Sequence, residues 1–333
     1  MKILYAIQGT GNGHVSRARE ILPMLSKYGE VDVLISGIQS DVDINFPIKY
    51  KRYGWSFIFG KNGGVNYPAT LRAMKNIQIL KDIKNFPIKQ YDLVINDFEP
   101  ISAWAAKLRD VPCVALSHQA AYLSSKTPRP ESKNWFIEQV YKYYAPASEF
   151  IGFHFDKYDY FIHTPVIRND IRKLNPSNKN HITVYHPAFD DKLLVGHFNK
   201  ILDIQFEVFS KHAKNAYIDK NVSVFPINSD AYTESLETCQ GLITAGGFEA
   251  PTEAIFLQKK VMVIPMKGQY EQLCNAEGAK IAGCTIVNDL AVNFSNEVSN
   301  WIQNGKFLKA NYPNETDEIL GKIIAKHQSL REI

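Results

Sequence analysis

A histidine stands at the end of a glycine-rich turn near the start of the chain. The residues Gly9-Thr-Gly11-Asn-Gly13-His14 follow a short apolar run and open a stretch with helical spacing. Glycines at such a turn let a ligand approach the backbone N–H groups at a helix start, so we expect Gly11, Asn12 and Gly13 to contact a bound ligand such as a phosphate group. An imidazole titrates near neutral pH and can take a proton from a hydroxyl group. His14 is therefore a candidate general base; the alternative is a histidine that caps the helix or is solvated.

A carboxylate is expected at the same sheet edge as His14. Asp97 follows the apolar run Tyr91–Asn96, which predicts a strand. The carboxyl ends of parallel strands meet at one edge, and a carboxylate there can orient an imidazole and stabilise its protonated form. The alternative is that Asp97 caps the next helix. His118 is the second residue of Ser117–Ser132, an aperiodic segment that predicts a long loop, and we expect it near a bound ligand such as a phosphate group.

The second half of the chain contains a glycine pair between an apolar run and a helical pattern. Leu242–Leu257 reads LITAGGFEAPTEAIFL. The free N–H groups and the dipole at a helix start both favour an anion, so we predict a diphosphate at Gly246, Gly247 and Phe248. Glu253 lies six residues beyond Gly247. That offset is about 9 Å along a helix and suits a carboxylate that binds the ribose of a nucleotide.

A second predicted strand and helix follow in the same region. Val261–Ala276 reads VMVIPMKGQYEQLCNA and places Glu271, Gln272 and Asn275 at a helix start. Neighbouring acid and amide groups supply the acceptors and donors that bind sugar hydroxyls. We expect the nucleotide base near Phe225, where an earlier strand of this half ends.

A nicotinamide-dinucleotide site is excluded by two features. The sixth position of the GxGxxG pattern is His14 instead of glycine, and the second predicted strand ends at Ser36-Gly37 instead of at an acid.

Apolar, β-branched runs alternate with longer amphipathic runs along the whole chain. Strands that are continuously apolar in such an alternation indicate parallel sheets buried on both faces. The pattern restarts after Val166. We therefore predict an α/β protein with two doubly wound, Rossmann-like domains that face a central cleft, comprising residues 1–166 and 167–333. The strands are expected at Lys2–Ile7, Val31–Ile35, Asp92–Asn96, Cys113–Leu116, Ile182–Tyr185, Phe206–Phe209, Val222–Phe225, Leu242–Thr244 and Val261–Ile264.

The composition agrees with a globular protein. The chain has 333 residues, of which 45% are hydrophobic and 22% charged, and this excludes a disordered or collagen-like chain. No apolar run is long enough to span a membrane. The four cysteines lie far apart, so we expect neither a zinc cluster nor a disulfide framework and infer a cytoplasmic protein.

Two segments resemble glycosyltransferases of the GT-B fold, in the group that contains the family 28 enzymes and the UDP-glycosyltransferases. The segment Gly9–Ala18 is similar to their GxGGH-type first loop, and Thr244–Ala276 is similar to their donor-binding signature. Ala250 and Pro251 replace the usual Ser-Thr of that signature, which leaves the donor phosphates more dependent on backbone N–H groups.

The resemblance implies inverting transfer of a sugar from a nucleotide-diphosphate donor, usually UDP, to a hydroxyl acceptor such as a lipid-linked or cell-envelope glycan. It implies that no obligatory metal or other cofactor is needed. The first domain would hold the acceptor and the base His14 with its partner Asp97. The second would hold the ribose at Glu253 and the sugar at Glu271 and Gln272.

The strongest charge feature lies between Lys49 and Gln90, with nine basic residues and one acidic residue, Asp82. A helix over Tyr67–Lys84 is predicted to be amphipathic with a cationic face. Its apolar positions recur every three residues: Leu71, Met74, Ile77, Leu80 and Ile83. Two interpretations stay open, a solvated helix face or contact with an anionic surface on the inner face of the membrane; no motif indicates a nucleic-acid partner.

Two other function classes also stay open. A nucleotide-sugar 2-epimerase would share the two-domain fold and the donor site but would need more acids and histidines in the cleft. A non-catalytic protein that binds a sugar nucleotide or a glycan would not need His14 beside Asp97.

Overall fold

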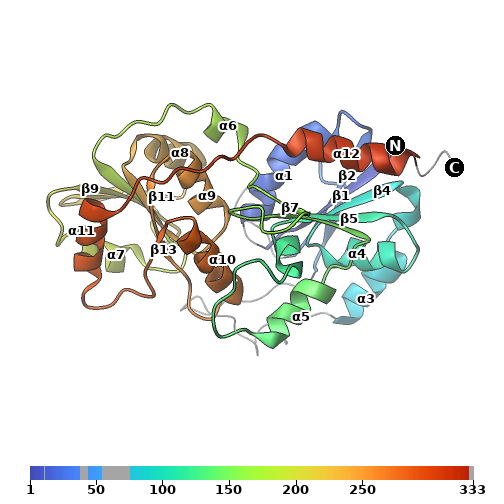
Figure 1. The fold of residues 1–333 in the computed structure, drawn as a ribbon, viewed down its shortest axis with the longest axis horizontal. Helices are drawn as coiled ribbons and strands as arrows, with labels where there is room; N and C mark the ends of the chain where they lie inside the picture. Colours follow the sequence, from blue (N-terminus) through green and yellow to red (C-terminus); the bar gives the residue numbers. More distant parts are fainter. Residues whose placement is uncertain (11, 38–43, 55–75, 330–333) are drawn as a thin grey trace.

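The computed structural model describes residues 1–10, 12–37, 44–54 and 76–329. Within them the chain forms two sheets of seven strands each, one in each half of the sequence (Figure 1). The first sheet is parallel throughout, in the order β3-β2-β1-β4-β5-β6-β7. Its strands are β1 (Lys2–Gln8), β2 (Glu30–Ser36), β3 (Tyr50–Arg52), β4 (Leu93–Asp97), β5 (Cys113–Ser117), β6 (Glu149–Phe153) and β7 (Ile162–His163).

The second sheet has the order β10-β11-β9-β8-β12-β13-β14. Only its edge strand β10 is antiparallel to its neighbour. The strands are β8 (His181–Tyr185), β9 (Gln205–Ser210), β10 (Tyr217–Asp219), β11 (Val222–Pro226), β12 (Gly241–Ala245), β13 (Lys260–Ile264) and β14 (Thr285–Ile286). Two parallel-dominated sheets with alternating helices confirm the predicted fold class.

Helices connect most of the successive strands and cover the sheets (Figure 1). The helices are α1 (Asn12–Leu25), α3 (Asn76–Asn85), α4 (Pro100–Lys107), α5 (Trp135–Tyr143), α6 (Asn169–Arg172), α7 (Asp191–Phe198), α8 (Ser229–Thr238), α9 (Glu249–Phe256), α10 (Tyr270–Ile281), α11 (Phe294–Asn304) and α12 (Thr316–Ser329). Two 3₁₀ turns, η1 (Ile88–Gln90) and η2 (Gln119–Leu123), lie in the first half.

The central strands are apolar on both faces because helices cover both faces. In β1, Ile3, Tyr5 and Ile7 belong to the core formed with α1 and α12, whereas Leu4 and Ala6 belong to the core formed with α3 and α4. Successive side chains of a strand point to opposite faces, so one continuous apolar run fills two cores. The first of these cores also takes in residues of the second half and joins the two halves by apolar contacts.

The last helix returns from the second half to the first. In Figure 1, α12 lies beside α1, and the two ends of the chain are on the same side of the molecule. Lys27 at the end of α1 pairs with Asp317, and His327 of α12 lies 3.1 Å from Glu149 of β6. The first sheet ends with β7 and the second begins with β8, and α12, near the end of the chain, packs against α1 beside the first sheet.

The basic stretch Lys49–Gln90 falls partly outside the described residues, because nothing is described between residues 55 and 75. Within α3 the expected apolar face is wrong: Ile79 and Ile83 are buried, whereas Ile77 and Leu80 are 73% and 63% exposed. A helix has 3.6 residues per turn, so positions three apart drift around it, and Ile79 and Ile83, four apart, share the buried face.

Candidate functional site

His14 and Asp97 meet at the carboxyl edge of the first sheet. His14 lies in the first turn of α1, and Asp97 is the last residue of β4, which pairs directly with β1. The His14 Nδ1 atom lies 2.8 Å from Asp97 Oδ1, and Asp97 is fully buried. A carboxylate accepts hydrogen bonds, so Nδ1 carries the proton and Nε2 is left as the acceptor. This tautomer is the one that a general base requires.

The backbone after Asp97 turns sharply. Phe98 has a φ of 55°, a left-handed conformation that costs energy for a side chain of this size. Glu99 follows and caps α4, accepting from the backbone N–H groups of Ile101 and Ser102. The capping role considered for Asp97 therefore belongs to Glu99, and the Asp97 carboxylate is used by His14 and Arg17.

Arg17 is a site residue that the sequence analysis missed. It lies three positions after His14 in α1, so both side chains share one helix face. Its Nε atom donates to Asp97 Oδ2 at 3.0 Å, and its Nη2 atom donates to both Asp97 oxygens at 2.9 Å. Burial disfavours the charge on Asp97, but Arg17 and then His14 outweigh it and lower the pKa of this carboxyl. The carboxylate next to His14 is thus held ionised.

Glu249, the first residue of α9, brings the second half of the chain to this cluster. Its Oε1 atom accepts from Arg17 Nη1 at 2.7 Å. A Cβ on Gly13 would clash with the Glu249 carboxylate, so a larger residue at this position would displace the Glu249 side chain. Burial opposes the charge on Arg17, but Asp97 and Glu249 outweigh it and raise the pKa of the guanidinium. Arg17 is therefore a permanent cation between two carboxylates.

Gln119 lies between His14 and the predicted sugar-binding residue Glu271. Its Nε2 atom donates to Glu271 Oε1 at 3.0 Å and lies 3.5 Å from His14 Nε2. The side chain is 4% exposed and comes from η2, within the segment predicted as a long loop. The acceptor atom of His14 thus faces the side chains that join the two halves.

Gln272 and Asn275 hold the second-half loops together. Gln272 Oε1 accepts from the backbone N–H groups of Gly246 and Met266, at 3.0 and 2.9 Å. Asn275 Nδ2 donates to the Gly246 carbonyl oxygen at 2.9 Å. The main-chain groups of Gly246 are therefore fixed from both sides by α10. Through these contacts Gln272 and Asn275 hold the glycine turn in position.

The rest of that turn is more open. Gly247 is exposed, and a side chain there would meet no atom within 4 Å. Phe248, at the N-cap of α9, provides no side-chain hydrogen bond to the first turn of the helix. This end of α9 therefore presents its backbone without a side-chain cap from within the described chain.

His118 is buried in the joint between the two halves. Its Nδ1 atom donates to the Phe153 carbonyl oxygen at 2.8 Å, and its Nε2 atom lies 2.7 Å from Asn275 Oδ1. The ring stacks on Phe248 with 3.9 Å between centroids. Burial lowers the pKa of His118. These contacts assign His118 a packing role, whereas contact with a bound ligand such as a phosphate group was expected.

Glu253 is paired within the protein. Arg168 Nε donates to Glu253 Oε1 at 2.6 Å, and Arg168 Nη2 donates to Oε2 at 3.1 Å. Burial raises the pKa of Glu253, and the Arg168 guanidinium opposes that rise. A ribose that binds Glu253 would share this carboxylate with Arg168.

The remaining predicted residues lie apart from the His14 cluster or outside the description. Phe225 is in β11, which β9 and β8 separate from β12, and its ring packs on Phe209 at 5.5 Å. Gly11 and the side chain of Asn12 lie outside the described residues.

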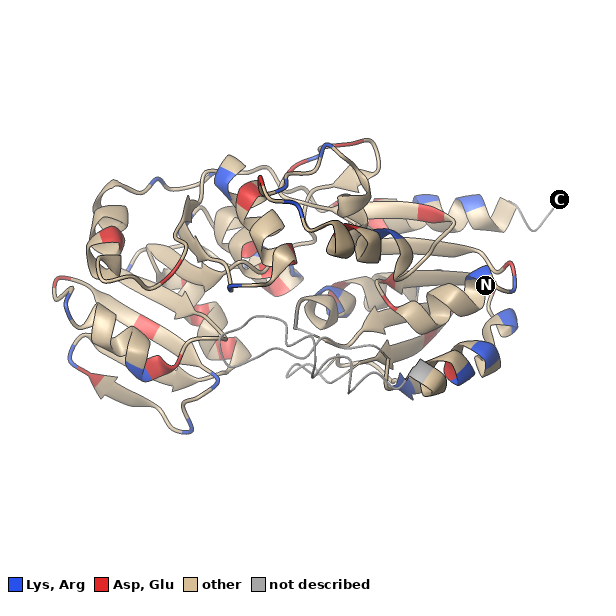
Figure 2. Ribbon diagram, turned by 90° about the horizontal axis from the view of Figure 1, so that it is seen from below, with Lys and Arg blue, Asp and Glu red and all other residues tan. Residues whose placement is uncertain are grey.

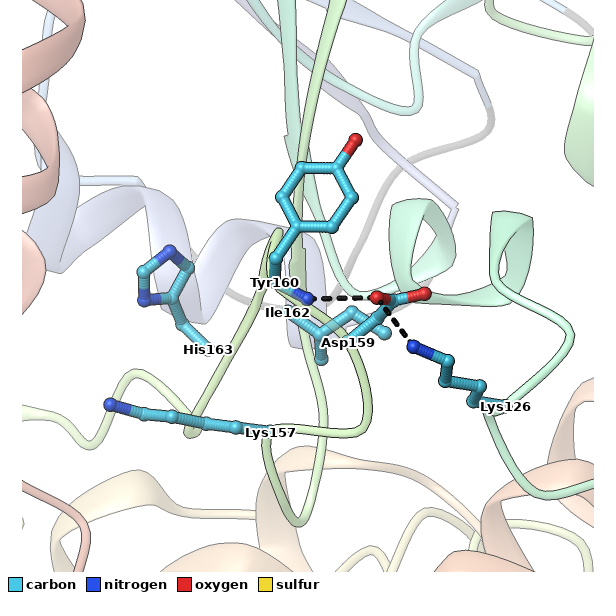
Figure 3. A pocket seen from close by; sticks show the side chains of 6 residues that line it. All are labelled: Lys126, Lys157, Asp159, Tyr160, Ile162 and His163. Carbon is cyan, nitrogen blue, oxygen red and sulfur yellow. Dashed lines mark hydrogen bonds and ion pairs between the residues drawn. The ribbon is translucent and has the colours of Figure 1, made fainter.

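A surface recess of about 670 Å³ lies on the first half, and His14 is not among the residues that line it (Figure 3). Its lysines are already paired: Lys126 with Asp159 at 3.1 Å, and Lys157 with Glu315 at 2.8 Å. These pairs leave it little net charge with which to attract an anion. The lining residues are Lys126, Lys157, Asp159, Tyr160, Ile162 and His163.

The described residues offer neither a metal-binding cluster nor a membrane-spanning helix. They contain no group of three or more His, Cys, Asp or Glu side chains placed to hold a metal ion. They also contain no helix that is both long and apolar enough to cross a membrane. The four cysteines are buried and unpaired.

Comparison with known structures defines the fold. The chain is similar to Acinetobacter baumannii MurG, with a TM-score of 0.61 and 15% identity over 98% of this chain and 99% of that one. It is similar to Streptomyces sp. SF2575 glycosyltransferase SsfS6 complexed with thymidine diphosphate, with a TM-score of 0.59 and 10% identity over 100% of both chains. It is also similar to Arabidopsis thaliana UGT89C1 complexed with UDP, with a TM-score of 0.58 and 13% identity over 98% and 94%. The fold is GT-B.

No curated protein sequence matches the chain significantly. The family model described as Glycosyl transferase family 1 matches residues 1–304. The chain belongs to this family and is a glycosyltransferase.

Proposed function

We propose that the protein transfers a sugar with inversion from a UDP-sugar to a hydroxyl group of a lipid-linked or cell-envelope acceptor. The observation that carries this proposal is the buried pair of His14 and Asp97, 2.8 Å apart, where the two halves meet. Asp97 fixes the tautomer that leaves Nε2 free to take a proton from the attacking hydroxyl. A protein that only binds sugar nucleotides has no need of such a pair.

In this proposal the diphosphate lies at the open turn formed by Gly247 and Phe248, before α9. The leaving diphosphate gains negative charge as the glycosidic bond breaks through an oxocarbenium-like transition state. Backbone N–H groups and the dipole at the start of α9 stabilise that charge. We propose that no divalent cation is required, since no cluster of potential metal ligands is found among the described residues.

The test is a transfer assay with UDP-glucose and UDP-N-acetylglucosamine as donors and diacylglycerol in vesicles or quercetin as acceptor. It is run with and without EDTA, and products are identified by mass spectrometry. We expect UDP release that depends on an acceptor, a glycosylated product, and little loss of rate in EDTA. Conversion of UDP-N-acetylglucosamine to its 2-epimer without an acceptor would instead indicate an epimerase. Complete loss in EDTA, restored by Mg²⁺, would contradict the metal-independent mechanism.

Replacement of Glu253 by glutamine is expected to weaken UDP binding by about 1.5–3 kcal/mol, because a charged acceptor for the ribose hydroxyls is lost. The measurement is calorimetric titration with UDP. Glu234→Gln, an exposed position on α8, is the matched control and should bind UDP as the unaltered protein does. Unchanged binding by the Glu253 variant would show that this carboxylate serves only Arg168.

Peripheral membrane contact is part of the proposal for the acceptor side. Ile77 and Leu80 are exposed on α3, and Lys81 and Lys84 of the same helix are exposed as well. An apolar and cationic helix face suits the headgroup region of an anionic bilayer. Elsewhere, basic and acidic segments are interspersed over both halves (Figure 2).

Co-sedimentation with phosphatidylserine vesicles tests the membrane proposal. We expect binding at about 50 mM salt and loss at about 500 mM, because each surface lysine contributes roughly 1 kcal/mol that salt screens. Changing Lys81 and Lys84 to glutamate should abolish the binding. The control is the same double change at Lys179 and Lys220, which are exposed in the second half. If the unaltered protein does not sediment at low salt, a soluble acceptor is favoured.

A further inference from the structure

The charged cluster around His14 draws its groups from both halves of the chain. Asp97 and Arg17 come from β4 and α1 of the first half, and Glu249 comes from the first turn of α9. Arg17 is 3% exposed, and its guanidinium contacts Asp97 and Glu249 through different nitrogens. The glycine at position 13 makes room for the Glu249 carboxylate. The Glu249 carboxylate therefore packs against the turn that carries His14.

The net charge of this cluster changes when His14 takes up a proton. With neutral His14, the first-half groups Asp97 and Arg17 cancel each other. A proton taken by His14 would then leave a net positive charge at a buried position, which is costly. With Glu249 present, the same proton brings the cluster from one negative charge to neutrality. The second half therefore supplies the charge that the base needs.

We propose that Glu249 is a positioning residue for the transfer reaction, which holds Arg17 and offsets the positive charge that His14 gains as it takes the proton. This inference rests on the proposed function, in which His14 is the base. This role also couples catalysis to the arrangement of the two halves. The Glu249 carboxylate can offset the positive charge on His14 only while α9 lies against α1. Water that reaches His14 in a separated arrangement would meet a weaker base, which would limit hydrolysis of the donor.

Among the described residues, the other groups around His14 do not supply this negative charge. Tyr5 on β1 stays neutral, because burial and then Asp97 raise its pKa. Gln119 is uncharged and separates His14 from Glu271. The pKa of His118 is lowered, chiefly by burial, so that ring adds no positive charge at neutral pH. Glu249 is the carboxylate bound to the same guanidinium as Asp97.

The test is a pH titration of the histidine ring nitrogens by NMR, on protein labelled with ¹⁵N-histidine, with the His14 signals assigned by their loss in His14→Ala. In Glu249→Gln we expect His14 to take up its proton about one pH unit lower than in the unaltered protein, since a nearby carboxylate has been removed. Glu234→Gln, the exposed control, should leave the titration within about 0.2 pH units. Retention of the other histidine signals in Glu249→Gln shows that the variant is folded.

This titration needs neither donor nor acceptor, so its outcome is separate from that of the transfer assay. No shift in Glu249→Gln, or a shift to higher pH, would overturn the inference even if the protein transfers sugar. Calorimetric titration with UDP tests whether Glu249 instead competes with the diphosphate. Binding of UDP that becomes tenfold tighter in Glu249→Gln, with an unmoved His14 titration, would show that Glu249 competes with the diphosphate and does not support the base.

Discussion

Replacement of His14 by alanine is expected to lower the rate of sugar transfer by about 10²–10⁴-fold, because the attacking hydroxyl loses its general base. UDP affinity should stay within a few-fold, since the proposed diphosphate site is on α9. The measurements are single-turnover transfer with the donor and acceptor found in the transfer assay, and calorimetric titration with UDP. Turnover close to that of the unaltered protein would mean that His14 is only a turn residue.

The partner of the base supplies the control for this prediction. Asp97→Asn should lower the rate less than His14→Ala does, and it should have little further effect when His14 is already alanine. Residues that act as a unit show such non-additive effects. Independent, multiplying losses from His14 and Asp97 would contradict the pairing seen at 2.8 Å.

Replacement of Arg17 by methionine is expected to lower the free energy of unfolding by about 3–5 kcal/mol. The change leaves the fully buried Asp97 carboxylate without its cation, and breaking a buried ion pair from one side costs this much. Denaturant titration at pH 7 measures the loss. Lys27→Met, which removes an exposed pair with Asp317, is the matched control and should cost less than about 1 kcal/mol.

The pH dependence of this loss has a definite sign. In the unaltered protein the pKa of Asp97 is lowered, so its stabilisation is present above the unfolded value of about 4 and is lost as the pH falls further. Without Arg17, burial raises the pKa of Asp97, and the variant regains stability by protonation as the pH is lowered. The difference in the free energy of unfolding between the unaltered protein and the Arg17 variant should therefore become smaller below neutral pH. A difference in the free energy of unfolding that stays constant down to pH 4 would contradict this explanation.

The strands and helices that position the site could be predicted because their sequences are strongly patterned. The apolar runs of β1, β4, β12 and β13 matched the observed strands closely, and the end of β4 was predicted to within one residue, at Asn96 instead of Asp97. Short elements at the sheet edges were missed. The strand β3 has three residues, and β7 and β14 have two each, too few to show a periodicity.

The contacts between the halves could not be predicted from local patterns. Arg17 follows His14 by three positions, and that spacing was a signal that the two side chains share a helix face. Nothing in the sequence near Glu249 indicates that it reaches Arg17, 232 positions away. The pairing of Glu253 with Arg168 was hidden for the same reason. Such pairs depend on how the two sheets are placed relative to each other. The periodicity of the sequence carries no information on that placement.

The proposed function requires that the turn before α9 binds a nucleotide diphosphate. The most direct measurement is a crystal structure of the protein with UDP. We expect the diphosphate within hydrogen-bonding distance of the backbone N–H groups of Gly247 and Phe248, with the ribose at Glu253. UDP bound elsewhere, for example in the recess between Lys126 and Lys157 (Figure 3), with the turn before α9 unoccupied, would contradict it.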